Sequence, residues 1–524
     1  MAGPDDRSEQ ERFAHGLRYS AYDALSSAVL GLISAVVTAR VFGAEVVGAL
    51  ALVTVLTGAL HLISNVQELG GLVRELTRYA PGAPEPRALM WATLTFSAVL
   101  TTAILVPFAV LAVWLLNDVF GQPELLVAFA ALAASYVLLD NSSANIEAPL
   151  AAYRDGRSIW LTHVAVTVAM SLTALACAAF GFDDLTGLVG CTIVASAVGL
   201  AARVRATRRL IGLRTSRHDV ERALGRMRSV LSFGIRAAPV NLTETAIGYA
   251  DTIVLGAHAP LDAIGAYSRA YGLYVRLGQI PVSLSRLYFP TMSSLHHRGD
   301  VAAMARLHRL ATRYLLLAIA PIATWLAACA PQVLAVFGPG FDQGATALGV
   351  LVFVAVLDCV ARPAGGALWA ADRPGVVSIV YGNVAAINVV LCLLLVPDHG
   401  LTGAAVANLA GWLVAAIALP LLAAREVARP RVAMFDVGYL ARLAAACGVV
   451  AAVAVPLRSL DGALAWQALA SGPALLAGLA VFRPLGRVDG QTVERALDAA
   501  RLESPRLRRA LRALHRIASH GRDS

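Results

Sequence analysis

Lysine is absent from the 524-residue chain, so all 43 of its basic residues are arginine. Charged residues make up only 15% of the sequence, whereas soluble globular chains average about 25%. A chain with so little charge lacks the polar surface that a water-soluble fold needs. A P-loop requires a lysine that contacts the nucleotide phosphates, so ATP hydrolysis at a Walker-type site is excluded.

Signals for other chemistry are also scarce. The six cysteines form no CxxC pair and all fall inside apolar runs, so we interpret them as packing residues and expect no disulfide framework. The acidic pair Asp183 and Asp184 and the histidines His296, His297 and His308 lie between apolar runs, which favours solvated loop residues over a catalytic or metal site. We expect no metal and no cofactor. Residues 1–18 carry both signs of charge without a small-residue cleavage site, which argues against a removed signal peptide.

Long uncharged runs dominate what remains. Ala88–Asn117, Tyr314–Phe341 and His399–Ala424 hold 30, 28 and 26 residues without a charge. A helix needs about 20 apolar residues to cross a bilayer, and strands of a membrane barrel are far shorter. The sequence therefore predicts an all-α membrane protein with about fourteen spans: 20–40, 47–69, 88–116, 124–148, 158–181, 184–202, 229–255, 262–289, 310–337, 343–371, 374–396, 401–424, 436–457 and 462–482.

The arginines alternate between the two sides of these spans. The segment before the first span, the even-numbered loops and the segment after the last span hold 34 of the 43, whereas the odd-numbered loops hold only Arg40 and Arg458. Cytoplasmic loops collect arginine and lysine, so both termini are predicted to face the cytoplasm. The basic tail after the last span is expected either to be solvated or to lie on anionic lipid.

Three short motifs recur at nearly constant offsets of 216 to 219 residues. Glu45–Ala49 returns at Asp262–Ala266, Arg154–Gly156 at Arg373–Gly375, and Leu185–Gly187 at Leu401–Gly403. Such a repeat predicts two six-helix bundles related by a parallel pseudo-two-fold axis around a central cavity. The expected divisions are a bundle over 1–202, a basic connector over 203–228, a bundle over 229–424, two appended helices over 425–484, and a basic tail over 485–524.

Polar residues fall on single helical faces of two predicted spans. In span 47–69 the stripe contains Thr54, Thr57, His61, Asn65 and Glu68, and in span 124–148 it contains Tyr136, Asp140, Ser143 and Glu147. A charge at mid-bilayer costs about 2.5–3.5 kcal/mol, so such residues usually face a cavity or a partner. We interpret the stripes as a hydrated cavity, with polar packing between helices as the alternative. The predicted lining or ion-coupling residues are His61, Asn65, Glu68, Asp140, Glu244 and Asp251.

Spans 229–255 and 262–289 together carry more arginine than acid. Arg269 and Arg276 are seven residues apart and share one helical face. Counting from the short turn between the spans puts Asp251 at the depth of Arg269, and Glu244 at that of Arg276. Even if these pairs neutralise one another, a positive excess remains near the cytoplasmic ends.

Four short motifs stand at the ends of predicted spans or in the turns between them: Gly48-Ala-Leu, Glu68-Leu-Gly-Gly-Leu-Val-Arg74, Asp251-Thr-Ile-Val-Leu-Gly256 and Gly265-Ala-Tyr267. In these motifs the chain resembles polysaccharide-type members of the multidrug/oligosaccharidyl-lipid/polysaccharide exporter superfamily. The resemblance covers about residues 15–425, and the extra pair of helices also suits fourteen-span members such as the lipid II flippases.

The resemblance implies a transporter in the bacterial inner membrane, not an enzyme, that flips undecaprenyl-diphosphate-linked oligosaccharide for surface polysaccharide synthesis. Its partners would be this anionic lipid, the bilayer and a coupling H⁺ or Na⁺, without nucleic acid. Arginine binds phosphate oxygens bidentately, so the predicted substrate contacts are Arg18, Arg236, Arg269 and Arg276.

Two other functions stay open at this point. A cation-coupled multidrug antiporter of the same superfamily would suit an acidic cavity, whereas spans 229–255 and 262–289 hold four arginines against two acids. A membrane-embedded glycosyltransferase or polymerase would usually carry a sizeable outside loop, and the odd-numbered loops here are short. Which glycan is carried is not specified by these motifs.

Overall fold

The computed structural model describes residues 4–64, 68–425, 437–459 and 463–482. Helices are the only regular secondary structure among these residues. The chain folds into two compact units, the first comprising Met1–Ser268 and Phe337–Phe341 and the second Arg269–Val336 and Asp342–Ser524. Ten described helical segments are long and apolar enough to cross a membrane. The chain is therefore an all-α membrane protein, while the count of fourteen spans and the predicted domain limits stay predictions.

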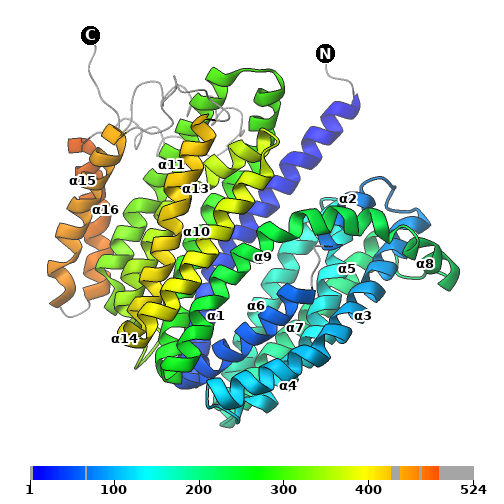
Figure 1. The fold of residues 1–524 in the computed structure, drawn as a ribbon, viewed down its shortest axis with the longest axis horizontal. Helices are drawn as coiled ribbons and strands as arrows, with labels where there is room; N and C mark the ends of the chain where they lie inside the picture. The colour runs from blue at the N-terminus through cyan, green and yellow to red at the C-terminus, as the bar shows by residue number, and fades with distance from the viewer. Residues whose placement is uncertain (1–3, 65–67, 426–436, 460–462, 483–524) are drawn as a thin grey trace. The chain divides into compact units, whose positions relative to one another are not determined.

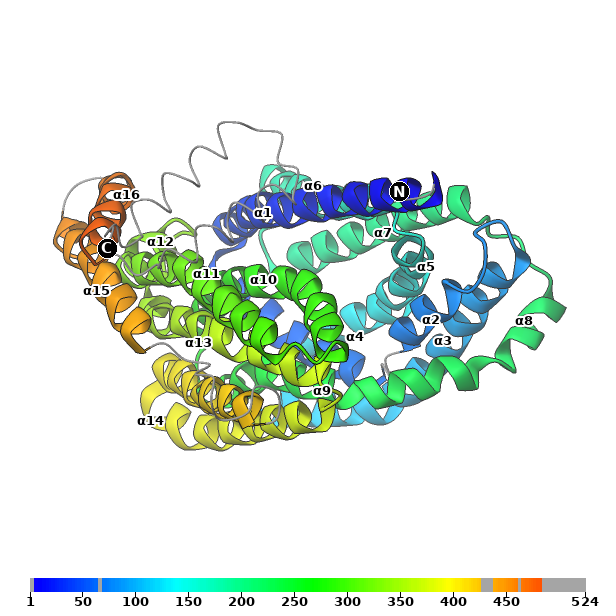
Figure 2. The same ribbon diagram turned by 90° about the horizontal axis from the view of Figure 1, so that it is seen from above.

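The described residues of the first unit form nine α-helices, two short π-helical segments and the start of α10 (Figure 1). Figure 2 shows α1, α6 and α7 running alongside one another, and α1 packs along α6 as α6 does along α7. The bounds are α1 (Pro4–Ser64), α2 (Glu68–Leu76), α3 (Pro84–Trp114), η1 (Leu115–Val119), α4 (Leu125–Ser135), η2 (Tyr136–Asp140), α5 (Asn141–Ala152), α6 (Gly156–Phe180), α7 (Leu185–Leu210), α8 (Arg217–Leu224) and α9 (Met227–His258).

The second unit begins within α10 (Leu261–His297), and the last two helices that the structure describes in it, α15 and α16, pack on each other (Figure 1). An ion pair one helical turn apart joins Asp358 and Arg362 of α13, with Arg362 Nε 2.8 Å from Asp358 Oδ2. The remaining bounds are α11 (Val301–Ala328), α12 (Ala330–Ala335), η3 (Asp342–Gly344), α13 (Ala345–Ala370), α14 (Pro374–Ala423), α15 (Val437–Ala454), η5 (Pro456–Ser459) and α16 (Ala463–Phe482).

Two glycines break the longest helices at places where the sequence predicts loops. Gly43 in α1 has φ 77° and Gly400 in α14 has φ 51°. Glycine adopts these angles without the clash that a Cβ atom would cause. Each break divides one long helix into the two segments that the apolar runs predict, so the connection there is a kink and not a loop.

The other repeated motifs adopt matching local geometry. Arg154 and Asp372, one residue out of register in the repeat, are the non-glycine residues with positive φ, at 58° and 57°, in the described part of the chain. A Cβ atom on Gly187 would lie 2.2 Å from the carbonyl oxygen of Phe182, and one on Gly403 would lie 2.5 Å from that of Leu395. Both glycines therefore lie close to the carbonyl oxygen of a residue that precedes them in the chain.

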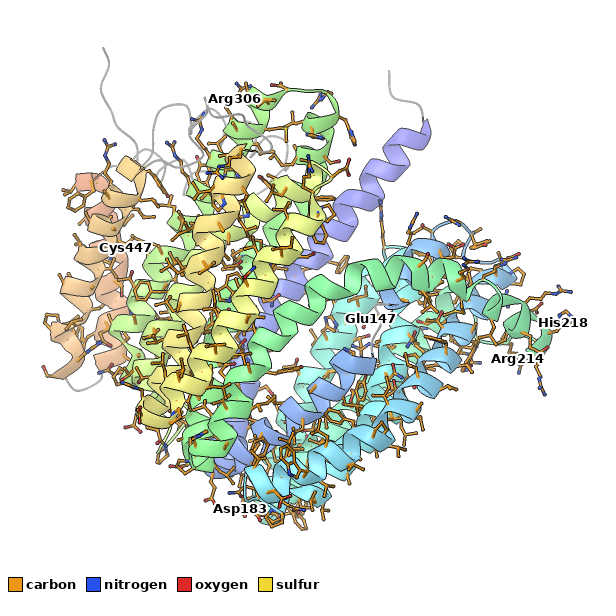
Figure 3. The ribbon with its side chains drawn as sticks, viewed as in Figure 1. Glu147, Asp183, Arg214, His218, Arg306 and Cys447 are labelled. Carbon is orange, nitrogen blue, oxygen red and sulfur yellow. The ribbon has the colours of Figure 1, made fainter. Side chains whose placement is uncertain are left out.

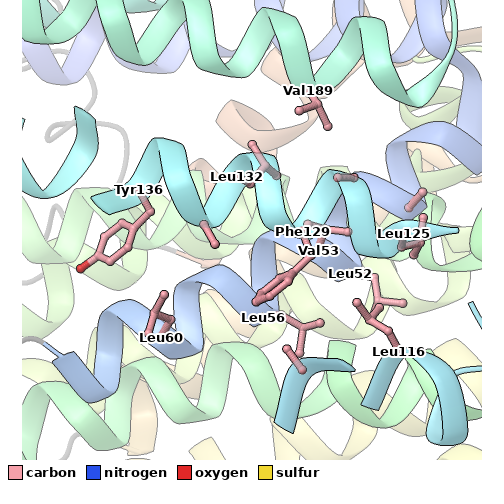
Figure 4. Packing of buried hydrophobic residues seen from close by; sticks show 14 of the residues in the cluster. Leu52, Val53, Leu56, Leu60, Leu116, Leu125, Phe129, Leu132, Tyr136 and Val189 are labelled. Carbon is pink, nitrogen blue, oxygen red and sulfur yellow. The ribbon is translucent and has the colours of Figure 1, made fainter. Parts of the chain in front are cut away.

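An apolar cluster lies in the first unit where α1, α3, α4 and η2 converge (Figure 4). Leu52, Leu56 and Leu60 project from α1 at helical spacing and are at most 1% exposed. They pack against Leu116 of η1 and Phe129 of α4. Dispersion between such side chains holds helices together inside lipid, where apolar burial alone gives little advantage.

The predicted basic connector is partly helical and docks on the first unit. Ser216 caps α8 by accepting a hydrogen bond from the Asp219 backbone amide over 3.1 Å. Ala223 and Met227 bury their side chains against a cluster that includes Leu89 of α3. α8 is therefore anchored on α3 through Ala223.

Candidate functional site

Charged side chains from four helices of the first unit meet near one end of the bundle. His163 Nδ1 on α6 lies 2.9 Å from Asp23 Oδ1 on α1, and His163 Nε2 lies 3.9 Å from Glu147 Oε2 on α5. Arg203 on α7 donates from Nε to the same Glu147 oxygen over 2.5 Å. Glu147 is thus shared by two basic groups. We call Asp23, Glu147, His163 and Arg203 the four-helix cluster; Figure 3 marks Glu147 among the helices of this unit.

A tight turn between α5 and α6 positions two members of the cluster. Arg154 supplies the left-handed residue of this turn with φ 58°. Asp155 then caps α6 by accepting hydrogen bonds from the Ser158 amide over 3.1 Å and the Ser158 hydroxyl over 2.7 Å. Glu147 lies about one and a half turns before the end of α5 and His163 about two turns into α6. The antiparallel helices therefore bring the two side chains to similar depth.

A cavity of about 300 Å³ borders the four-helix cluster. Its polar lining consists of Asp140, Ser143, Glu147, His163 and Arg203. The volume is large enough for several water molecules, and the polar lining offers them partners. Three residues of the stripe predicted in span 124–148 thus line one cavity.

Tyr136, the fourth residue of that stripe, lies apart from the cavity. The π-helical segment η2 takes more residues per turn than an α-helix, so it shifts the phase between Tyr136 and Ser143. The Tyr136 hydroxyl lies 2.5 Å from His61 Nδ1 of α1. His61, predicted as cavity lining, is therefore paired with a tyrosine of the apolar cluster.

The predicted cationic residues are distributed over both units. Asp251 is fully buried, and the Tyr267 hydroxyl donates to its Oδ2 over 2.5 Å. Arg269 and Arg276 belong to the second unit, where Arg276 donates from a terminal guanidinium nitrogen to the Gly272 carbonyl over 3.0 Å. The predicted pairing of Asp251 with Arg269 would involve one residue from each unit, and it stays a prediction.

Several predicted site residues fall where the structure gives no side-chain description. Arg18 lies in α1, Glu68 begins α2, and Arg236 and Glu244 lie in α9, with their side chains outside the described residues. Asn65 lies outside the described residues altogether. The substrate-contacting role of the four arginines stays a prediction. His308, predicted to be solvated, is instead 2% exposed and lies 3.2 Å from the Tyr288 hydroxyl.

Sequence reasoning missed Asp23, His163 and Arg203 as site residues. Arg203 counted only as a connector charge, and the two others were single polar residues in apolar runs. A signal was nevertheless present, because all three lie within a few residues of the predicted cytoplasmic ends of their spans. Equal depth on neighbouring helices is the condition under which isolated charges meet.

The sequence matches a family model described as polysaccharide biosynthesis protein over residues 16–296, more than half of the chain. The chain belongs to this family. Within the polysaccharide biosynthesis family it is similar to the probable flippase AglR of Haloferax volcanii, with 30% identity over 191 residues. That match covers 34% of this chain and 39% of AglR, so it spans well under half the length of the curated relative.

Solved structures share the fold of this family member at low sequence identity. The lipid II flippase MurJ in an inward closed conformation aligns with a TM-score of 0.68 at 13% identity, covering 88% of this chain and 98% of MurJ. An inward-facing multidrug transporter of the MATE family aligns with a TM-score of 0.59 at 16% identity, covering 76% and 94%. The chain therefore has the fold of the multidrug/oligosaccharidyl-lipid/polysaccharide superfamily.

Proposed function

We propose that this protein flips an undecaprenyl-diphosphate-linked oligosaccharide from the cytoplasmic to the outer leaflet of a bacterial inner membrane, for surface polysaccharide synthesis. Membership of the polysaccharide biosynthesis family over residues 16–296 is the observation that carries the proposal. The similarity to a probable flippase and the shared fold with a lipid II flippase add support.

The chemistry of the substrate suits the residues available. A diphosphate headgroup cannot cross hydrocarbon without a hydrated path and compensating cations. The cavity of about 300 Å³ in the first unit, lined in part by polar residues, offers room for water between the helices. Arg236, Arg269 and Arg276 on α9 and α10, together with Arg18 on α1, are our proposed headgroup contacts. In this role the protein moves its substrate without changing a covalent bond.

Orientation follows from charge. Figure 3 locates Asp183 at one end of the helices of the first unit and Arg214 and His218 at the other. The arginine-rich end is proposed to face the cytoplasm, because positive residues are retained on that side during insertion. Both termini are proposed to lie there as well.

Depletion of the protein in its native host tests the function. We expect surface polymer to disappear while lipid-linked precursor accumulates where only cytoplasmic-side reagents reach it. Expression of the wild-type chain should restore the polymer. Normal polymer together with lost resistance to cationic drugs would instead support the multidrug antiporter, whose fold this chain shares.

A further inference from the structure

His163 is held between two carboxylates that come from different helices. Its Nδ1 atom is within hydrogen-bond distance of Asp23, at 2.9 Å. An ionised Asp23 can only accept, so the neutral imidazole carries its proton on Nδ1 and keeps the lone pair on Nε2. That lone pair lies 3.9 Å from Glu147 Oε2. Without a proton on Nε2, the lone pair of this nitrogen faces the negatively charged Glu147 carboxylate, which is unfavourable. A proton added to Nε2 therefore gives an ion pair between His163 and Glu147.

The formal charges around His163 favour an added positive charge. Asp23 on α1 and Glu147 on α5 are acidic, whereas Arg203 on α7 is the permanent cation among the charged groups given around His163, and Asp140 lines the same cavity. For Asp23, Glu147, Arg203 and His163 the formal sum is −1 with His163 neutral and 0 with His163 protonated. In a poorly solvated environment, a smaller unbalanced charge costs less free energy.

The residues of the four-helix cluster favour a proton over a metal ion as the bound cation. Among the described residues, no group of three or more His, Cys, Asp or Glu side chains is placed to hold a metal ion. Histidine is the side chain whose ordinary charge change falls between about pH 5 and 8. The adjoining cavity of about 300 Å³, at the end of the bundle proposed to face the cytoplasm, gives water a place from which to deliver the proton.

We infer that the four-helix cluster is a proton-binding site of the first bundle, with His163 Nε2 as the atom that takes the proton from cavity water. With the proton bound, His163 on α6 forms an ion pair with Glu147 on α5. Glu147 also accepts a hydrogen bond from Arg203 Nε over 2.5 Å. Because Asp23 already joins α6 to α1, protonation links three helices through one imidazole. The role of this proton in transport rests on the proposed flippase function, whereas its binding does not.

Binding is tested directly on the purified full-length protein by NMR titration of labelled histidine side chains between about pH 5 and 8. The signal lost in His163→Gln identifies the residue. We expect Asp23→Asn and Glu147→Gln each to lower its titration midpoint by about one pH unit or more, because each removes a neighbouring negative charge. His218, exposed on α8, is the reference, and its midpoint should stay unchanged in both variants. The inference is overturned if the His163 signal does not titrate, or if its titration midpoint is unchanged in both Asp23→Asn and Glu147→Gln.

Coupling is tested with the same proteins in liposomes that contain the lipid-linked oligosaccharide. The wild-type flipping rate should depend on pH, whereas His163→Gln and His163→Lys should lose that dependence and His218→Gln should keep it. Membrane abundance and thermal stability of each variant exclude misfolding as the cause. Persistent pH dependence in both His163 variants overturns the coupling role. If the wild type flips nothing while His163 titrates as expected, the proposed function fails and the proton site stands.

Discussion

Gly48 and Gly265 pack against each other through their backbones in the first unit. A Cβ atom on Gly48 would lie 1.7 Å from the Leu261 carbonyl oxygen, and one on Gly265 would lie 2.0 Å from the Ala44 carbonyl oxygen. The repeat shift of 217 residues relates Gly48 to Gly265 and Ala44 to Leu261, so each contact is the equivalent of the other. A contact in which each partner meets the equivalent of the other is typical of a two-fold axis.

Adding a methyl group at this crossing should damage the protein. Gly48→Ala and Gly265→Ala each place a Cβ against backbone atoms, which cannot move aside by changing a side-chain rotamer. We therefore expect each substitution to lower the free energy of unfolding by about 1–3 kcal/mol or more. Melting in detergent, followed by fluorescence-detected size exclusion, measures the effect. Gly190→Ala in α7 is the matched control, because no atom lies within 4 Å of its added Cβ. Equal melting temperatures for all three variants would contradict the close packing.

Cysteine labelling tests the orientation of the chain in the membrane. In a background without native cysteines, Thr215→Cys in the connector should resist a membrane-impermeant maleimide in intact cells, because we place the connector in the cytoplasm. Asp183→Cys, in the turn before α7, should react. Permeabilisation should expose position 215. Labelling of position 215 without it would reverse the proposed topology.

Arginine substitutions distinguish substrate binding from structural pairing. Loss of a charge-assisted contact costs about 1.5–3 kcal/mol, so Arg276→Ala should reduce polymer export about tenfold or more at normal membrane abundance. Arg276→Lys should restore part of the export, since lysine keeps the charge but not the bidentate geometry. Arg222→Ala on the exposed face of α8 serves as control. The same design applies to Arg236 and Arg269. Normal export by all three alanine variants would exclude them as headgroup contacts.

The stabilisation that the N-terminal cap gives α8 should depend on pH. A hydrogen bond from the Ser216 hydroxyl lowers the pKa of Asp219 below its ordinary value. Because the pKa of Asp219 is lower in the folded state, the stabilisation that this hydrogen bond gives is present above about pH 4. It is lost as the pH falls through the folded-state pKa. Ser216→Ala should therefore reduce hydrogen-exchange protection of the Asp219 amide at neutral pH. The difference from wild type should shrink under acidic conditions, and a difference that grows there would contradict this role of the cap.

Apolar runs and arginine counts were sufficient to predict the class of fold, because bilayer thickness and helical rise leave few alternatives. They did not predict that α1 and α14 continue through Gly43 and Gly400, since a kink and a short loop have the same composition. Helical periodicity predicted a common face for Asp140, Ser143 and Glu147, but it assigned Tyr136 to that face because it assumed regular α-helix through η2. His163 was missed because its partners are contributed by other helices, and no single-helix pattern contains them.

Reconstitution of the purified chain with an undecaprenyl-diphosphate-linked oligosaccharide tests the central claim most directly. The lipid is placed in both leaflets, and a membrane-impermeant glycan-cleaving enzyme is added outside. The account predicts that nearly all of the lipid becomes accessible over time with the protein, and only about half in protein-free liposomes. Accessibility that stays at about half with folded protein, while a cationic drug moves across the same membranes, would contradict the account.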